Sequence, residues 1–118
     1  MLRANTAPRK RNSGRPLDKD APRFLQWLRG RNCVLAGQAG HVCEGKIEAC
    51  HVDYAGGKGM GTKVADRFAI PGCSGAHRRQ HAIGWTRFEA ETGINALRLA
   101  NDFWKAWPGR SAWETKRG

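Results

Sequence analysis

Four cysteines set the tightest limit on how this chain can fold. The chain has 118 residues with fifteen glycines, five prolines and a charged fraction of 26%, so its apolar inventory is modest and supports a single small domain. Something besides hydrophobic burial should therefore help to hold the fold together. Two disulfides or one tetrahedral metal site could do this. The four are Cys33, Cys43, Cys50 and Cys73.

The rest of the sequence favours the metal site. The N-terminal residues contain no apolar run of signal-peptide length, and no later segment approaches the length of a transmembrane helix. We therefore expect a cytoplasmic protein without a membrane partner, and in that reducing setting a cysteine cluster more often binds metal than forms disulfides. The sequence predicts that the four cysteines together hold one structural zinc ion, with His41 left as an exposed loop residue. A degenerate loop without zinc remains an alternative.

The charge of the chain points to a polyanionic partner. The formal net charge is +11, which exceeds what solubility needs and makes nucleic acid the first candidate. Ribosomal and membrane-surface proteins share such a charge, so charge alone does not identify the function, which has to be inferred from motifs. Residues 1–16 are basic with little to bury and predict a disordered arm, and residues 17–118 predict one domain.

Apolar periodicity and turn residues predict an α+β fold. A short helix should follow Asp20 as its N-cap and end at Gly30. Alternation predicts one strand over residues 46–53, and a returning strand is predicted over residues 67–71. Three further helices are predicted over residues 73–82, 84–91 and 95–107. Trp104 and Trp107 are assigned to the core, because apolar stripes at helical spacing usually face one.

Three histidines occupy positions suited to phosphodiester hydrolysis. His51 lies on the first predicted strand, and an imidazole with a pKa of about 6.5 can accept a proton from water near neutrality. His77 and His81 lie one turn apart on the following helix and could share one cation. Such a cation stabilises charge on the phosphoryl oxygens and the leaving group. The arrangement predicts a hydrolase with one histidine base and one metal ion.

These histidines lie within segments that resemble a known family. The segments ACHV (49–52), GMGTK (59–63) and DRFAIP (66–71), with Cys73, His77 and His81, resemble the HNH (ββα-metal) endonucleases. Within that family they are similar to a phage and prophage group that includes a recombination-associated nuclease. The resemblance spans about residues 24–94. It implies a small ββα-metal core with a structural zinc loop and flanking helices.

The resemblance also implies roles for particular residues. His51 would be the general base, and His77 and His81 would bind the catalytic metal, Mg²⁺ or Mn²⁺ with Zn²⁺ or Ni²⁺ as alternatives. Asp66 is the nearest counterpart of the middle Asn of the HNH pattern. In many HNH enzymes the residue before the base is a metal ligand, so Cys50 could instead serve the catalytic metal. DNA is the implied substrate, in a bacterial host or phage-infected cell, with a recombinase or another phage DNA-processing protein as partner.

Basic residues near these segments are candidates for contacts to the nucleic-acid backbone. Lys58 and Lys63 belong to the glycine-rich loop over residues 56–63, whose other interpretation is a plain hairpin connection. Arg78 and Arg79 flank the helical histidines, where a guanidinium could hold a phosphate by two hydrogen bonds. Two other classes of function stay open. One is a non-catalytic, zinc-stabilised DNA-binding accessory protein, and the other is a ribosomal-type RNA-binding protein.

Overall fold

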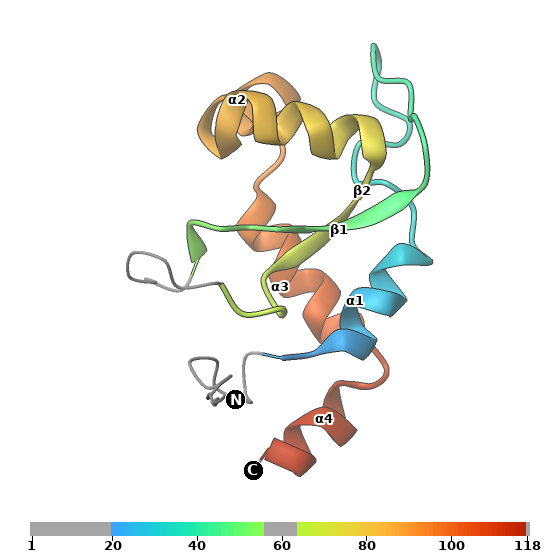
Figure 1. Ribbon diagram of the computed structural model, residues 1–118, viewed down its shortest axis with the longest axis vertical. Helices are drawn as coiled ribbons and strands as arrows, with labels where there is room; N and C mark the ends of the chain where they lie inside the picture. Colours follow the sequence, from blue (N-terminus) through green and yellow to red (C-terminus); the bar gives the residue numbers. More distant parts are fainter. Residues whose placement is uncertain (1–19, 56–63, 118) are drawn as a thin grey trace, which may run out of the picture.

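The computed structural model describes residues 20–55 and 64–117, and over these residues it is a small α+β protein. Helix α2 lies on one side of the β1–β2 hairpin, and helices α1 and α3 lie on the other (Figure 1). The predicted N-terminal arm and the loop carrying Lys58 and Lys63 lie outside the described residues. The elements in chain order are α1 (Pro22–Arg29), β1 (Ile47–His51), β2 (Ala69–Cys73), α2 (Ser74–Thr92), α3 (Ala96–Ala106) and α4 (Arg110–Arg117).

The two strands form an antiparallel hairpin whose register places Ile47 opposite Cys73 and His51 opposite Ala69. Both predicted strands are therefore present, but β2 continues to Cys73 and α2 begins one residue later than predicted. The reason is that Cys73 is the N-cap of α2: it has extended backbone angles, and its sulfur accepts a hydrogen bond from the Ala76 amide. The end of the hairpin thus leads directly into α2.

The residues predicted to form two helices, 73–82 and 84–91, lie in one kinked helix, α2. Gly84 divides it with φ 82° and ψ 161°, a backbone conformation that side chains other than glycine rarely adopt. Helix α3 starts as predicted, with the Asn95 side chain accepting a hydrogen bond from the Arg98 amide. Helix α4 was not predicted. Neither α2 nor any other helix among the described residues is long and apolar enough to cross a membrane.

The start of α1 differs from the prediction in its cap. The N-cap residue is Ala21 rather than Asp20, and the Ala21 side chain makes no capping hydrogen bond. Instead, the Ala21 amide donates a 2.9 Å hydrogen bond to Oδ2 of Asp66, which is buried just before β2. A carboxylate at this end of a helix is favoured by the free amides and by the helix dipole. Asp66 therefore fastens α1 to the segment that leads into β2.

Two apolar clusters hold the elements together. One lies between the hairpin, α2 and the start of α3 and includes Val52, Ile70 and Trp85. The other lies between the hairpin, α1 and α3 and is built on aromatic rings, with Phe24 in edge contact with Trp104 at 5.0 Å between ring centroids. The prediction that Trp104 and Trp107 are core residues is confirmed, and Trp85 is buried as well.

Phe24 offers a direct test of the second cluster. The side chain is fully buried, and it contacts Trp107 as well as Trp104. We expect Phe24→Ala to lower the free energy of unfolding by about 3–5 kcal/mol, because it removes the ring and leaves a cavity. Urea denaturation followed by circular dichroism measures the change, with the exposed neighbour substitution Arg23→Ala as the control. A loss below about 1 kcal/mol would show that this cluster contributes little to stability.

Candidate metal centres and catalytic residues

The clearest site is a cluster of three cysteines and one histidine at the start of α2. Atoms that could serve as ligands, one from each of four residues, all lie within 4.8 Å of one another, and the residues are Cys33, His41, Cys43 and Cys73. Nε2 of His41 is 3.3 Å from the Cys43 sulfur, 3.8 Å from that of Cys73 and 3.9 Å from that of Cys33. Around a tetrahedral zinc ion, sulfur and nitrogen ligands lie about 3.5 Å apart. The cluster could therefore bind a metal such as zinc.

Local backbone geometry explains how residues far apart in the sequence reach this cluster. The loop between Cys33 and Cys43 turns at Gly37 and Gly40, which have φ angles of 86° and 82°. Gly45 then passes so close to α2 that an added Cβ would lie 2.7 Å from the Ser74 Cβ. Two hydrogen bonds hold the loop against the helix start, from the Ser74 amide to the Lys46 carbonyl and from the Gly75 amide to the Glu44 carbonyl.

Amide hydrogen bonds to sulfur favour the thiolate form that metal binding needs. The Leu35 amide lies 3.4 Å from the Cys33 sulfur, and the Ala76 amide lies 3.4 Å from the Cys73 sulfur. Burial opposes ionisation of Cys73, but the backbone amides of Ala76 and Glu44 hold the pKa of its thiol below the usual value. A Cys73 thiolate at the N-terminus of α2 is a suitable zinc ligand.

The prediction of the fourth ligand was wrong. Cys50 does not belong to the cluster, and His41 takes the place assigned to it. The hairpin register explains this, because Cys73 pairs with Ile47 whereas Cys50 lies three positions further along β1, opposite Ile70. Cys50 is buried, and its sulfur lies 3.7 Å from the Glu48 carbonyl oxygen. Burial has the largest effect on the pKa of this thiol, and the charge of Glu48 has the next largest. Together they raise the pKa to about 12, so Cys50 stays a neutral thiol.

A second group of polar residues lies between β1 and the first two turns of α2. Nδ1 of His77 is 2.7 Å from Oε1 of Glu48, and Nε2 of His77 is 3.1 Å from Nε2 of His81. Ser74 donates a 2.8 Å hydrogen bond to the other oxygen of Glu48. These two bonds lower the pKa of the Glu48 carboxyl, the contact with His77 having the larger effect. The structure therefore brings His77 and His81 together, as the sequence predicted.

The distance between the two imidazoles suits a shared cation. Two imidazole nitrogens bound to one zinc-sized ion at about 2.0–2.1 Å lie about 2.8–3.4 Å apart, for arrangements from right-angled to tetrahedral. Glu48 accepts the proton of His77 Nδ1, which leaves the lone pair of Nε2 directed at His81. A carboxylate that holds a histidine in this tautomer is the usual second partner of a metal-binding imidazole. The sequence analysis did not assign Glu48 a role.

His51 has a different set of partners. Its Nε2 lies 3.0 Å from Oδ1 of Asp66, whose other oxygen accepts the Ala21 amide. The backbone carbonyl of His51 accepts a 3.2 Å hydrogen bond from the Trp85 indole. Asp66 thereby fixes the Nε2–H tautomer of His51 and leaves Nδ1 as the basic atom. A carboxylate-oriented imidazole of this kind can act as a general base.

The structure does not join His51 to the helical pair. Among the described residues no hydrogen bond links His51 to His77 or His81. Glu48 and His51 are three positions apart on β1, about 10 Å along the strand, and this odd spacing directs their side chains to opposite faces. Ala49, on the same face as His51, packs against the α1–α3 cluster. One phosphate can meet all three imidazoles only if the nucleic acid reaches both faces of β1.

The two arginines predicted to contact phosphate are both in ion pairs on the surface. Arg78 is 3.3 Å from Oε1 of Glu44, and Arg79 makes three contacts of 2.8–3.1 Å with Glu91. The pair with Arg79 lowers the pKa of the Glu91 carboxyl. Each arginine would have to exchange its carboxylate for a phosphate to bind nucleic acid.

Comparison with known proteins adds a family. Residues 14–107, which make up most of the chain, match the family described as protein of unknown function (DUF968). No curated protein and no solved structure matches the chain. The interpretation of the site therefore depends on its own geometry.

Proposed function

This chain belongs to the DUF968 family, and from its two polar sites we propose that it is a zinc-stabilised, divalent-cation-dependent endonuclease or nickase acting on DNA. The observation that carries the proposal is the pair of His77 and His81 nitrogens 3.1 Å apart, with Glu48 holding the tautomer of His77. His81 is exposed and His77 is half-buried, so a cation bound between their nitrogens would remain open to solvent and to a phosphate. The resemblance to HNH nucleases supports the same assignment.

Within this proposal His77 and His81 hold the cation through their Nε2 atoms. A bound divalent ion supplies charge stabilisation for the phosphoryl oxygens and the leaving oxygen of a phosphodiester. Glu48 keeps the Nδ1 proton of His77 and so orients the ring. His51 accepts the proton of the attacking water at Nδ1, while Asp66 stabilises the imidazolium that forms.

The cluster of three cysteines and His41 has a structural role in this proposal. It joins the loop 33–43 to the end of β2 and to the first turn of α2, the turn that leads to His77. A zinc ion there fixes the start of the helix that carries the second site. The HNH-like layout, the cytoplasmic location in a bacterial host and a recombinase or other phage DNA-processing protein as partner belong to the proposal through the resemblance alone.

A second function is favoured by a specific observation, the separate partners of His51 and of the helical pair. If His51 does not act on the same phosphate as the helical pair, the cysteine and histidine cluster and the net charge of +11 fit a non-catalytic DNA-binding accessory protein.

Plasmid cleavage separates the two functions. Zinc-loaded protein is incubated with supercoiled plasmid and added Mg²⁺ or Mn²⁺, and the expected result is conversion to nicked or linear DNA. The control is the double substitution His77→Ala with His81→Ala at unchanged zinc content, because a chelator would also strip the structural zinc. DNA binding without conversion under every added cation would favour the accessory protein.

Glu48 provides a prediction about the second site that does not depend on activity. Glu48→Gln keeps the size of the side chain but no longer offers a charged acceptor to His77 Nδ1. We expect it to weaken binding of a divalent cation at His77 and His81 by about 10–100-fold, the usual effect of removing such a partner. Titration of zinc-loaded protein with Mn²⁺, followed by paramagnetic broadening of the histidine resonances, measures the change. Unaltered Mn²⁺ affinity would remove Glu48 from the site.

A further inference from the structure

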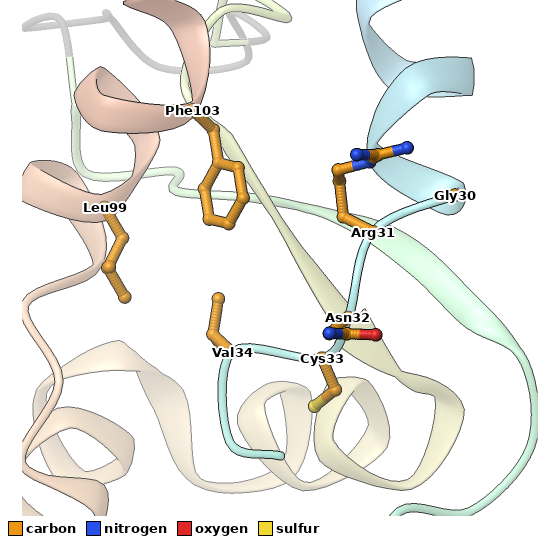
Figure 2. A pocket seen from close by; sticks show the side chains of 7 residues that line it. All are labelled: Gly30, Arg31, Asn32, Cys33, Val34, Leu99 and Phe103. Carbon is orange, nitrogen blue, oxygen red and sulfur yellow. The ribbon is translucent and has the colours of Figure 1, made fainter. Parts of the chain in front are cut away.

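A surface cleft opens between the segment after α1 and helix α3, and its lining includes none of His51, His77 and His81. It has a volume of about 640 Å³, within the range of about 300–1,000 Å³ found for ligand pockets. Figure 2 shows Leu99 and Phe103 projecting from α3 on one side and the chain from Gly30 to Val34 forming the other.

The walls of the cleft differ in chemistry. Phe103 and Leu99 supply an apolar side, and Val34 adds apolar surface from the facing segment; all three are only partly buried. Arg31 and Asn32 are exposed on the opposite side and supply a guanidinium and an amide (Figure 2). This combination suits a nucleotide. The aromatic face can stack on the flat base, the amide can donate and accept hydrogen bonds at the base edge, and the guanidinium can bind the phosphate.

The cleft is held in shape by contacts on both sides. The Val34 amide donates a 3.0 Å hydrogen bond to the Pro71 carbonyl of β2, and the Arg31 amide donates one of 2.9 Å to the Leu28 carbonyl. The Arg31 guanidinium lies 4.9 Å from the ring centroid of Trp27, which is in edge contact with Phe103. The next residue on this wall, Cys33, belongs to the metal cluster. A ligand would therefore meet a preformed surface.

We propose that this cleft binds one unpaired nucleotide of a single-stranded stretch of nucleic acid, with the base against Phe103 and the phosphate at Arg31. The net charge of +11 argues for a polyanion over a peptide or an apolar ligand. A base can lie against a side chain only after it leaves the duplex stack, so the occupant is unpaired. The proposal rests on the nucleic-acid substrate of the proposed function and narrows it to DNA with single-stranded segments.

Fluorescence anisotropy tests the cleft without any cleavage. Zinc-loaded protein is titrated into a labelled 20-nucleotide single strand, and into the matching duplex, without added Mg²⁺ or Mn²⁺. Arg31→Ala, Asn32→Ala and Phe103→Leu should each weaken single-strand binding by about fivefold or more, since contacts of this kind contribute substantially to each bound base. Phe103→Leu keeps apolar bulk and removes only the aromatic face. Duplex binding should change by less than about twofold.

Arg29→Ala is the matched control, because it removes one exposed arginine from the same region without altering the cleft lining. If Arg29→Ala weakens single-strand binding as much as Arg31→Ala does, binding depends on charge alone and the cleft proposal is overturned. Equal losses for single strand and duplex overturn it as well. Selective loss of single-strand binding by a protein that cleaves no plasmid would uphold the cleft and reject the nuclease.

Discussion

Replacing Cys33 with serine is expected to abolish zinc binding and to leave the protein largely unfolded at 25 °C. Cys33 is buried, and it is one of four residues whose potential ligand atoms lie within 4.8 Å of one another. Structural zinc contributes about 10–16 kcal/mol of apparent binding energy in small zinc domains, which is comparable to the total stability of about 5–15 kcal/mol of most domains. Metal content per chain and the thermal unfolding curve by circular dichroism are the two measurements. Wild-type protein should carry one zinc ion and Cys33→Ser none.

Cys50→Ser is the matched control for that substitution. Cys50 is as buried as Cys33 but lies outside the cluster, so the variant should keep one zinc ion and lose only about 1–3 kcal/mol from burying a hydroxyl. His41→Ala should lower zinc affinity, although His41 was predicted to be only an exposed loop residue. Loss of zinc in Cys50→Ser with retention in His41→Ala would restore the all-cysteine site and contradict the structure.

The period of the apolar residues was enough to predict part of the fold. Alternation identified β1, and helical spacing of apolar residues identified α1 and α3, because each pattern reflects a face that must be buried. Strand β2, in which every residue is buried, and the two halves of α2 were predicted without such a pattern. The start of α2 was misplaced by one residue because the role of Cys73 as a cap depends on a hydrogen bond to Ala76. Helix α4 was missed because Pro108 and Gly109 suggested that the helical region ended there.

The ligand sets could be predicted only in part. His77 and His81 are four residues apart on one helix, so their proximity follows from the helical repeat alone. The place of His41 depends instead on the left-handed turns at Gly37 and Gly40, and the exclusion of Cys50 depends on the hairpin register. Both are tertiary features without a local signal, although the short spacing of His41 and Cys43 within a glycine-rich loop could have suggested a shared ligand role.

His51→Ala and His77→Ala are each expected to reduce plasmid cleavage by about 10²–10⁴-fold while zinc content and unfolding temperature stay near those of the wild type. The reason differs between the two variants. In the proposed mechanism Asp66 orients His51 as the base, whereas Glu48 orients His77 as a ligand of the cation. Cleavage at the wild-type rate by His51→Ala would remove the base assignment, and unchanged dependence on Mg²⁺ in His77→Ala would remove the ligand assignment.

Combining the two substitutions tests whether His51 and His77 act at one phosphate. His51 lies on one face of β1, whereas His77 packs against the other face through Glu48. Residues that act as a unit give strongly non-additive effects, so the double variant should be little slower than the slower single variant. If the two residues contributed independently, the fold losses of the two single variants would multiply in the double variant. A multiplied loss would mean that the Asp66–His51 pair and the Glu48–His77–His81 group contribute independently to cleavage rather than as one unit.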